Sequence, residues 1–335
     1  MFASAAPRRA AAQNAPLDPR CVSTSPATST AYAASVVEQD ACQKSIDLFN
    51  FLAPQLGALV AGGSTELGHA GTLGGLGHAG LALRANVLGG GRLPDVGNVG
   101  LSYAGAQRTS FGVNAQALAL PALDAGIGLF SGVPVGLTRV GGLDLLLSGA
   151  YVPSFSSGAV RVDRTGGALQ IGYGARLGLL ARSRFVPGVA VSYLHRRLPE
   201  TSITAQTTNG GMIGVTGARV STDAWRLAAE QHLSILGLSA GVGRDRYRTR
   251  ATLAGDPGVI PANLPAVAFS APVAQGLTRT NVYGGASLPA GGLAQLVAEV
   301  GRVSGGGTVA TYNSFSGHTP TDAYTYASVG VRIGR

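Results

Sequence analysis

Short blocks of this chain alternate strictly between apolar side chains and small or polar ones. In the clearest block, residues 168–179, Leu169, Ile171 and Tyr173 alternate with glycine, glutamine and arginine. A repeat of two is the repeat of a β-strand, whose successive side chains point to opposite faces. The polar face of a soluble sheet usually carries Lys, Glu and Thr rather than glycine and an occasional arginine. A barrel that faces lipid outside and a wet or plugged lumen inside requires the pattern found here.

The composition favours a membrane β-barrel over a helical membrane protein and over a disordered chain. The chain has 51 glycines, about twice the usual share, and only 12% charged residues, about half the globular norm. Hydrophobic residues make up 45%, which excludes disorder. Mean hydropathy is positive at +0.24, yet no stretch approaches the roughly 18 apolar residues of a spanning helix. A membrane strand needs only about 10 residues, half of them apolar.

The net charge of +9 comes almost entirely from arginine, since Lys44 is the only lysine. The arginines are dispersed through the strand-like blocks, without the basic clusters or the basic–aromatic interleaving of a nucleic-acid module. We therefore expect no nucleic-acid partner. Part of the positive charge is expected to face anionic lipid headgroups and part to line the lumen.

We predict an all-β fold, an antiparallel up-and-down transmembrane β-barrel of about 10 strands, with about 8–14 as the range. Tight connectors near 182–184, 234–236 and 289–291 alternate with long ones near 91–114, 252–268 and 305–322. Tight periplasmic turns and long outer loops are typical of outer-membrane barrels, so we predict a bacterial outer-membrane location with a periplasmic C-terminus. The strands are expected near residues 77–90, 115–131, 141–153, 166–181, 186–204, 215–234, 236–251, 269–288, 292–304 and 323–335.

Three parts are expected along the chain: a remnant of a signal peptide or a disordered tail (1–12), a flexible leader with a helix (13–62), and the barrel (63–335). Residues 1–12 lack the apolar core of a complete signal peptide, but three alanines before Gln13 resemble a cleavage site. The helix is predicted to begin near Asp40 and to stop or kink at Pro54. It is expected to dock on the barrel, or to plug its mouth.

The only cysteines, Cys21 and Cys42, precede the barrel. In an oxidising periplasm they are expected to form one disulfide, whereas in the cytosol they would be free thiols. Their spacing does not fit a metal or redox site.

Strand parity predicts which charges face inward. A charge that faces lipid near the midplane costs about 2–4 kcal/mol, whereas opposite charges can pair across a lumen. Aromatic residues near the predicted strand ends are expected to form interfacial girdles, as at Phe130, Tyr151, Tyr193, Trp225, Tyr247 and Tyr324. The predicted lumen residues are Arg176, Arg196, Arg226, Glu230, His232, Asp245, Glu299 and Arg332.

Four arginines alternate at the outer end of one predicted strand, with the parity of lipid-facing Leu238 and Val242. Just above the membrane they could contact phosphate groups of outer-leaflet lipid, since arginine binds phosphate bidentately. The alternative is a solvated strand extension whose charge serves solubility. The four are Arg244, Arg246, Arg248 and Arg250.

No catalytic, metal or cofactor site is expected. His69 and His78 lie in a repeated Leu-Gly-His-Ala-Gly segment, but no further ligand converges on them and the glycines suit a bend. His232 and Ser234 would lie about 7 Å apart on one strand face, too far for a direct hydrogen bond. We therefore predict that the protein is not an enzyme.

The segment Tyr324–Arg335 resembles the C-terminal strand of bacterial outer-membrane proteins, although it ends in arginine rather than an aromatic residue. From Ser45–Phe49 through Thr72–Gly77 to the end, the chain resembles uncharacterised bacterial outer-membrane β-barrel proteins. A helical segment before a barrel is also similar in architecture to the hatch of long-chain fatty-acid transporters. The resemblance implies two partners, outer-membrane lipid and the barrel-assembly machinery.

The expected function is a channel or transporter for small solutes, with a lumen that mildly favours anions. The first alternative is a non-conducting structural or adhesive barrel whose long loops bind lipid or surface partners. The second is a secreted, glycine-rich β-sandwich or solenoid. The sequence does not identify the solute.

Overall fold

The computed structural model describes residues 15–22, 29–64, 70–152, 154–157, 159–164, 167–257 and 269–334. The expected signal-peptide remnant or tail, residues 1–12, lies outside these ranges.

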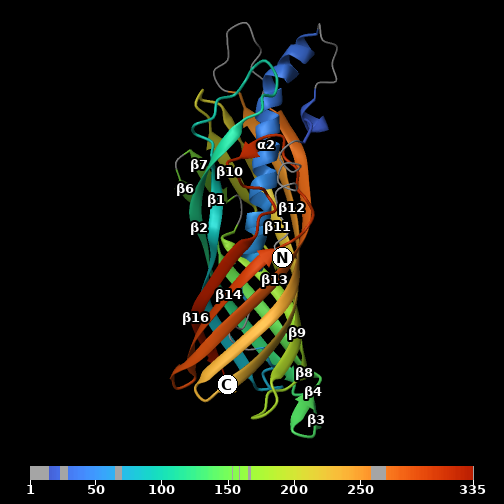
Figure 1. Ribbon diagram of the computed structural model, residues 1–335, viewed down its shortest axis with the longest axis vertical. Coiled ribbons are helices and arrows are strands. Elements are labelled where there is room, and N and C mark those ends of the chain that lie inside the picture. The colour runs from blue at the N-terminus through green and yellow to red at the C-terminus, as the bar shows by residue number, and fades with distance from the viewer. Residues whose placement is uncertain are drawn as a thin grey trace, which may run out of the picture.

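Ten long strands pair edge to edge, each antiparallel to both neighbours. Each pairs with the next along the chain, and β16 pairs with β1, so the pairings form a ring (Figure 1). The prediction of an antiparallel up-and-down barrel of about ten strands is confirmed. The wall strands are β1 (Ala79–Asp95), β2 (Ser110–Phe130), β5 (Gly142–Tyr151), β8 (Leu169–Leu180), β9 (Gly188–Arg197), β11 (Met212–Leu233), β12 (Leu236–Asp256), β13 (Phe269–Gly291), β14 (Ala294–Ser304) and β16 (Tyr324–Gly334).

Shorter strands lengthen the wall at one end, and at the other end β3 and β4 form a separate two-stranded sheet. The predicted strand 186–204 is wrong in one respect, because the structure divides it into β9 and β10. Pro199 lies between the two and has no N–H to donate to a ladder. The short strands are β3 (Val133–Val135), β4 (Thr138–Val140), β6 (Phe155–Ser157), β7 (Val160–Arg164), β10 (Thr201–Gln206) and β15 (Ser314–Phe315).

The two ends of the barrel differ in their connections (Figure 1). The β11–β12 turn is only Ser234–Ile235, and the β3–β4 hairpin lies at the same end. The long connectors 96–109 and 305–323 lie at the opposite end. We call these the turn end and the loop end. Turns are periplasmic and long loops are outside in barrels of this kind, so the C-terminal strand ends on the periplasmic side.

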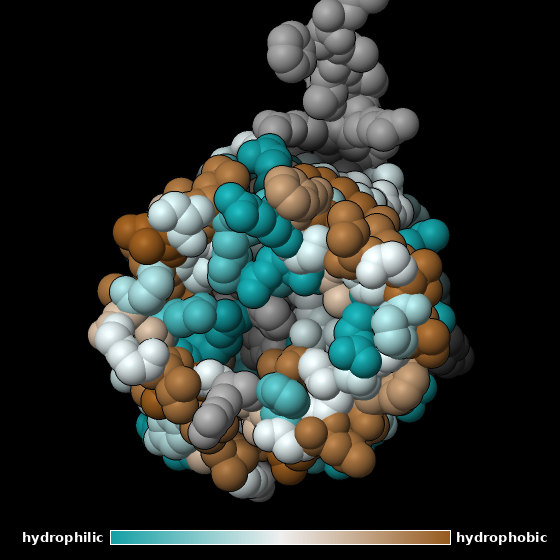
Figure 2. Space-filling view, turned by 90° about the horizontal axis from the view of Figure 1, so that it is seen from below, coloured by the Kyte–Doolittle hydropathy of each residue, from teal (hydrophilic) through white to brown (hydrophobic). Residues whose placement is uncertain are grey.

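The outer surface of the barrel carries an apolar band. Side chains of β8 alternate between exposed and buried along the strand, and Ile171 is 68% exposed. Seen from the turn end, apolar residues form much of the rim (Figure 2). A continuous apolar band has far more apolar area than a soluble monomer exposes to water, so this surface faces the hydrocarbon of a membrane. The protein is therefore a transmembrane barrel of the outer-membrane type. Its outward side chains include Leu81, Leu83, Leu123, Ile127, Leu145, Leu147, Leu227, Val242, Val282, Val300, Val329 and Val331.

Two of the expected girdle residues face the interior instead. Tyr151 and Trp225 are about half exposed, at 48% and 56%, but Tyr247 and Tyr324 are each only 1% exposed. Tyr247 has the same strand parity as Asp245, and both point inward. The girdle prediction was therefore wrong for Tyr247 and Tyr324, because it considered their distance from the strand ends and not their parity.

A long helix, α2 (Thr30–Ala61), follows the short 3-10 helix η1 (Pro19–Cys21) and runs inside the barrel from the loop end (Figure 1). It begins well before the predicted start near Asp40 and continues through Pro54. Proline lacks the N–H that would bond the carbonyl of Asn50. Gln275 of β13 donates to that carbonyl instead, over 3.1 Å. The barrel wall thus replaces the missing helix bond.

Within the described residues, no helix combines the length and the hydropathy that a membrane crossing requires.

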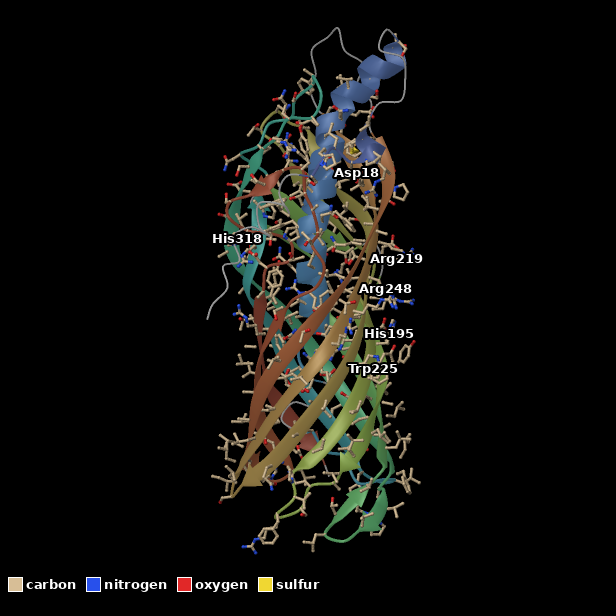
Figure 3. All side chains as sticks on the ribbon, turned by 45° about the vertical axis from the view of Figure 1, so that its right-hand side comes forward. Asp18, His195, Arg219, Trp225, Arg248 and His318 are labelled. Atoms are coloured by element: carbon tan, nitrogen blue, oxygen red, sulfur yellow. A yellow bond between two sulfur atoms is a disulfide. The ribbon has the colours of Figure 1, made fainter. Side chains whose placement is uncertain are left out.

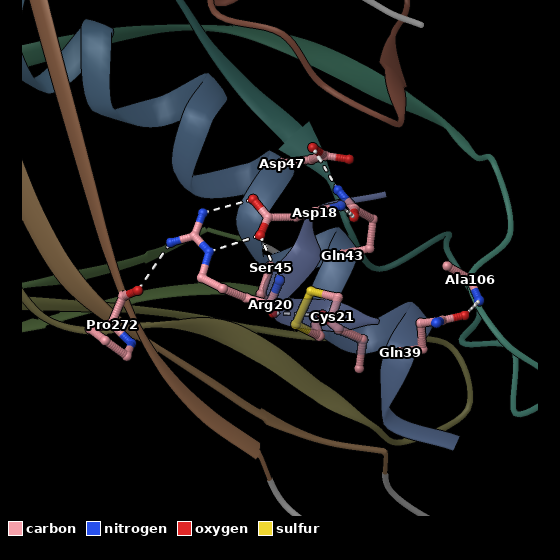
Figure 4. Close-up of a disulfide and its surroundings, with 11 residues drawn as sticks. Asp18, Arg20, Cys21, Gln39, Gln43, Ser45, Asp47, Ala106 and Pro272 are labelled. Carbon is pink, nitrogen blue, oxygen red and sulfur yellow. Dashed lines mark hydrogen bonds and ion pairs between the residues drawn. A yellow bond between two sulfur atoms is a disulfide. The ribbon is translucent and has the colours of Figure 1, made fainter. Parts of the chain in front are cut away.

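A disulfide between Cys21 and Cys42 ties η1 to α2 (Figure 4). The Asp18 carboxylate pairs with Arg20 over 2.7 Å, and Arg20 also donates to the carbonyl of Pro272 on β13 over 3.0 Å. The segment before the helix is thereby held at the loop end of the barrel.

The apolar band can be tested with a charge at mid-height. Leu147→Arg is expected to lower the free energy of unfolding by about 2–4 kcal/mol. Leu137→Arg, at the tip of the β3–β4 hairpin, should change it by less than about 0.5 kcal/mol. Urea unfolding of the barrel in liposomes, followed by heat-modifiable gel mobility, measures both. Equal losses would show that the band does not face hydrocarbon.

Candidate functional site

The C-terminal end of α2 meets side chains of the barrel wall. Arg196 of β9 is 1% exposed and donates to the carbonyls of Val60, Ala61 and Gly63 over 3.3, 3.1 and 3.1 Å. The last carbonyls of a helix have no partner within it and carry its negative dipole end. A single buried arginine therefore satisfies the last two helix carbonyls and that of Gly63, two residues beyond the helix.

Three further wall residues complete this contact. Arg226 of β11 donates to Ala61, Arg84 of β1 donates to Gly62 over 3.4 Å, and Asn86 of β1 donates to Leu59 over 2.7 Å. Each carbonyl from residue 59 to 63 thus accepts a hydrogen bond from the wall. Three arginines and one asparagine, from three strands, hold the helix end in the lumen.

Two glycines allow this close approach. A Cβ on Gly57 would lie 2.5 Å from the ring of Tyr247, so the helix rests directly on that tyrosine. Gly63 has φ +73°, and a Cβ there would lie 2.6 Å from both Arg84 and Ser328. Only glycine fits at Gly63, because other residues are strained at positive φ.

Beyond the helix, wall carboxylates hold the chain in the lumen through its N–H groups. Glu299 accepts from the hydroxyl of Ser64 over 2.6 Å and from its N–H over 3.3 Å. Glu230 accepts from the N–H of Ala70 over 2.7 Å, and Asp144 from the N–H of Leu73 over 3.1 Å. We call α2 with residues 62–64 and 70–73 the plug. The plug seat is the set of wall residues whose side chains bind residues 59–64 and 70–73 of the plug: Arg84, Asn86, Asp144, Arg196, Arg226, Glu230 and Glu299.

The buried charges of the wall balance. Arg176 pairs with Asp144 over 2.7 Å, and Arg84 pairs with Asp124. Burying a charge is costly unless it is paired and hydrogen-bonded, so paired side chains are expected here. Among the described wall residues, five arginines and five carboxylates are buried: Arg84, Arg176, Arg196, Arg226, Arg279, Asp124, Asp144, Glu230, Asp245 and Glu299.

The structure buries six of the eight predicted lumen residues inside the barrel: Arg176, Arg196, Arg226, Glu230, Asp245 and Glu299. The other two, His232 and Arg332, are half-buried near the turn end. His232 contacts Arg182 over 2.6 Å, and Arg332 donates to Gln295. Sequence reasoning missed Arg84, Asn86, Asp124, Asp144 and Arg279, although the same parity rule could have found them. Nothing in the strand pattern indicated that these side chains bind backbone groups of the plug.

The loop half of α2 is bound by the long connectors. Asp47 accepts hydrogen bonds from the N–H groups of Tyr312 and Asn313, over 3.2 and 2.8 Å, and from the side chain of Asn313 over 2.7 Å. Asp40 accepts from the N–H groups of Ser102 and Gln107, over 2.7 and 3.0 Å. The helix therefore organises both loops, and burial raises the pKa of Asp47 to about 6.

A mainly apolar cavity of about 390 Å³ lies beside α2, between the helix and the wall. The helix contributes Leu52, Leu56 and Leu59 to its lining. The wall contributes mostly aliphatic side chains from several strands, including Leu93, Leu118, Leu120, Val152, Val160, Val162, Leu198, Ile203 and Val220.

The four arginines at the outer end of β12 are all exposed on the outer surface. They lie on the same face of the strand as Leu238 and Val242, and Arg248 lies closer to the loop end than Trp225 does (Figure 3). Arg248 pairs with Asp223 of β11 over 2.7 Å.

The structure bears on the expected absence of catalytic and metal sites only in part. His195 lies 2.8 Å from Asp223 on the outer surface, in contact with Tyr173 rather than with a nucleophile. The described residues contain no cluster of three or more His, Cys, Asp or Glu that could hold a metal. Of the two repeated histidines, His78 is exposed and His69 lies outside the described residues. That the protein is not an enzyme stays a prediction.

No protein-family model matches the chain, and no curated protein matches it. Among solved structures, the chain is similar to the β domain of the Bordetella autotransporter BrkA, with 14% identity over 76% of this chain and 98% of that one and a TM-score of 0.36. The Escherichia coli outer-membrane protease OmpT has 11% identity over 81% and 100%, with a TM-score of 0.37. The TodX ΔS2S3 mutant monoaromatic hydrocarbon channel has 11% identity over 83% and 74%, with a TM-score of 0.31.

Likeness at this level carries no conclusion about activity. The assignment to the bacterial outer membrane rests on the barrel itself, on its apolar band and on its unequal ends. The protein is an outer-membrane β-barrel with its own N-terminal helix inside it.

The raised pKa of Asp47 predicts a pH-dependent stability. Between about pH 4 and 6 the folded state binds more protons than the unfolded state, so the free energy of unfolding falls as the pH rises through this range. The loss amounts to roughly 3 kcal/mol, because one pKa unit corresponds to about 1.4 kcal/mol. Asp47→Asn should remove this part of the pH dependence.

Thermal unfolding of the protein in detergent, on both sides of this pH range, measures the effect. The control is Asp163→Asn, which alters a more exposed carboxylate on β7 and should keep the wild-type slope. An Asp47→Asn variant with the wild-type slope would contradict the assignment.

Proposed function

We propose that the protein is a channel or transporter for small solutes, closed at rest by its own plug, and that these solutes are apolar. The observation that carries this proposal is the cavity of about 390 Å³ between α2 and the wall. Its volume lies within the range of small-molecule sites, about 300–1,000 Å³.

The lining of the cavity supports an apolar ligand. Its polar side chains are few. The Gln55 amide already forms two hydrogen bonds with the backbone of Arg92: it accepts from the N–H over 2.7 Å and donates to the carbonyl over 3.0 Å. A site that offers few free hydrogen-bonding groups favours ligands that need none.

Two unpaired strand edges suggest the route of entry. β2 pairs with β5 only as far as Ala122 and Ala150, and within the described chain β6 ends the sheet on the other side. The cavity lining includes residues 116–120 on the first edge, and Val152 and Ser156 beside the second. We infer that solutes enter sideways between these edges, near the outer girdle residue Tyr151, rather than through the loops.

Passage onward requires the plug to leave its seat, because residues 62–64 and 70–73 occupy the lumen toward the turn end. The buried wall charges that surround this segment balance, so the described residues give no support for an anion preference. The anion preference expected from the sequence is not part of the proposal.

The second candidate is a non-conducting structural barrel whose long loops bind lipid or surface partners. The observation that favours it is the number of contacts that hold the plug, since the seven residues of the plug seat bind it and six of them are charged. In that case α2 is a permanent core for the loops.

Conductance separates the two candidates. Arg196→Met removes three hydrogen bonds from a charged donor to the plug, each worth roughly 1.5–3 kcal/mol, so open events in planar bilayers should become about tenfold more frequent or more. Removal of residues 1–62 should open the barrel further. Arg197→Met, on the same strand but exposed outside, is the control and should stay closed. If neither the wild type nor any variant conducts, the result would support the structural candidate.

Ligand binding tests the cavity directly. Leu118→Trp places a larger ring in the cavity and should lower the amount of naphthalene bound per barrel about tenfold, because the ring takes the ligand's space. Leu123→Trp, on the lipid-facing side of the same strand, should bind as the wild type does. Equilibrium dialysis of amphipol-stabilised protein measures both. Equal binding by all three forms would mean that the cavity is not the site.

A further inference from the structure

We propose that the outer surface of the barrel above the apolar band binds phosphate groups of an outer-leaflet lipid. The site is centred on Arg244, Arg246 and Arg248 of β12. It lies outside the lumen, so it does not depend on the proposed transport function.

The arginines form a row on one face of the strand. Residues at every second position lie about 6.6–6.8 Å apart along a strand and point the same way. The row continues the line of lipid-facing Leu238 and Val242. Guanidinium groups in this row therefore lie where the headgroups of the outer leaflet begin.

Most of these arginines form no ion pair with another residue of the described chain. Among the described residues, no ion pair involves Arg244, Arg246 or Arg250, and Arg250 lies directly opposite Arg219 of β11. Like charges directly opposite each other are destabilising. The two acidic partners are Asp223, which pairs with Arg248, and Glu200, which pairs with Arg219. Five arginines against two carboxylates leave a net charge of +3 for an external anion.

Small residues on the neighbouring strand leave a trough beside the row. Thr280, Thr278 and Gly276 of β13 lie opposite Arg244, Arg246 and Arg248, respectively. A Cβ built on Gly276 would meet nothing within 4 Å. The resulting open depression of about 900 Å³ is lined by the three arginines, with Tyr193 and Trp225 at its other side. This leaves room for a phosphorylated headgroup next to the guanidinium groups.

Aromatic residues place the trough at the membrane interface. Trp225 is the cross-strand neighbour of Arg244, and its ring centroid lies 4.9 Å from that of Tyr193. Asp223 accepts a hydrogen bond from Tyr193 over 2.8 Å and so links this pair to Arg248. Tryptophan and tyrosine are typical of the headgroup level of membranes. We therefore infer that an anion bound here belongs to a lipid. Two N–H groups of a guanidinium can bind two oxygens of one phosphate group.

The test uses the full chain in detergent, titrated with bisphosphorylated lipid A and followed by native mass spectrometry. The triple variant Arg244→Gln, Arg246→Gln, Arg248→Gln should bind on the order of tenfold more weakly or worse. Gly276→Phe keeps every charge but fills the trough, and should weaken binding by a similar factor. Heat-modifiable gel mobility verifies that each variant is folded.

Two matched controls exclude general effects of charge and bulk. Arg139→Gln, Arg161→Gln and Arg184→Gln together remove the same charge from exposed positions elsewhere, and Gly284→Phe adds the same ring lower on the same face of β13. Both should bind as the wild type does. Equal losses in the charge control, wild-type binding by the triple variant, equal binding of dephosphorylated lipid A, or displacement of the lipid by inorganic phosphate would each overturn the proposal.

Discussion

The arginines that meet the C-terminus of α2 are the contact on which the rest of this structure depends. A helix end carries about half a negative charge and several carbonyls without partners. Arginines buried in a barrel interior need hydrogen-bond acceptors, because each cation loses its water ligands on burial. Arg84, Arg196 and Arg226 meet both needs at one place. With this end held, the helix provides the surface on which the loops pack.

The lumen of this barrel is a binding site for its own backbone. Arginines bind carbonyls at the helix end, and carboxylates bind N–H groups further along, so each kind of wall charge meets the backbone dipole of opposite sign. Six of the ten charged residues buried in the wall are accommodated in this way, three arginines and three carboxylates.

Much of the wall could be predicted from the sequence, because strands that face lipid on one side repeat with a period of two and end at short turns. Parity also assigned Arg196 and Glu299 to the interior. Parity could not reveal what each inward-facing charge binds. A charge that faces a solute path and a charge that binds a plug occupy the same positions in the alternating pattern. The end of α2 was predicted too early, because the bond that replaces the one lost at Pro54 comes from Gln275, which is distant in sequence.

The direction of α2 has a consequence for how the protein is assembled. Its first turn lies at the loop end, its last in the lumen, and β1 starts at the turn end. A chain delivered from the periplasm must therefore carry a hairpin, made of η1 and the start of α2 joined by the Cys21–Cys42 disulfide, to the loop end. A helix with its side chains is about 10–12 Å wide, so a finished ring around it leaves little room for such a hairpin. A ring that stayed open at the β1–β16 seam until the helix was in place would avoid this passage.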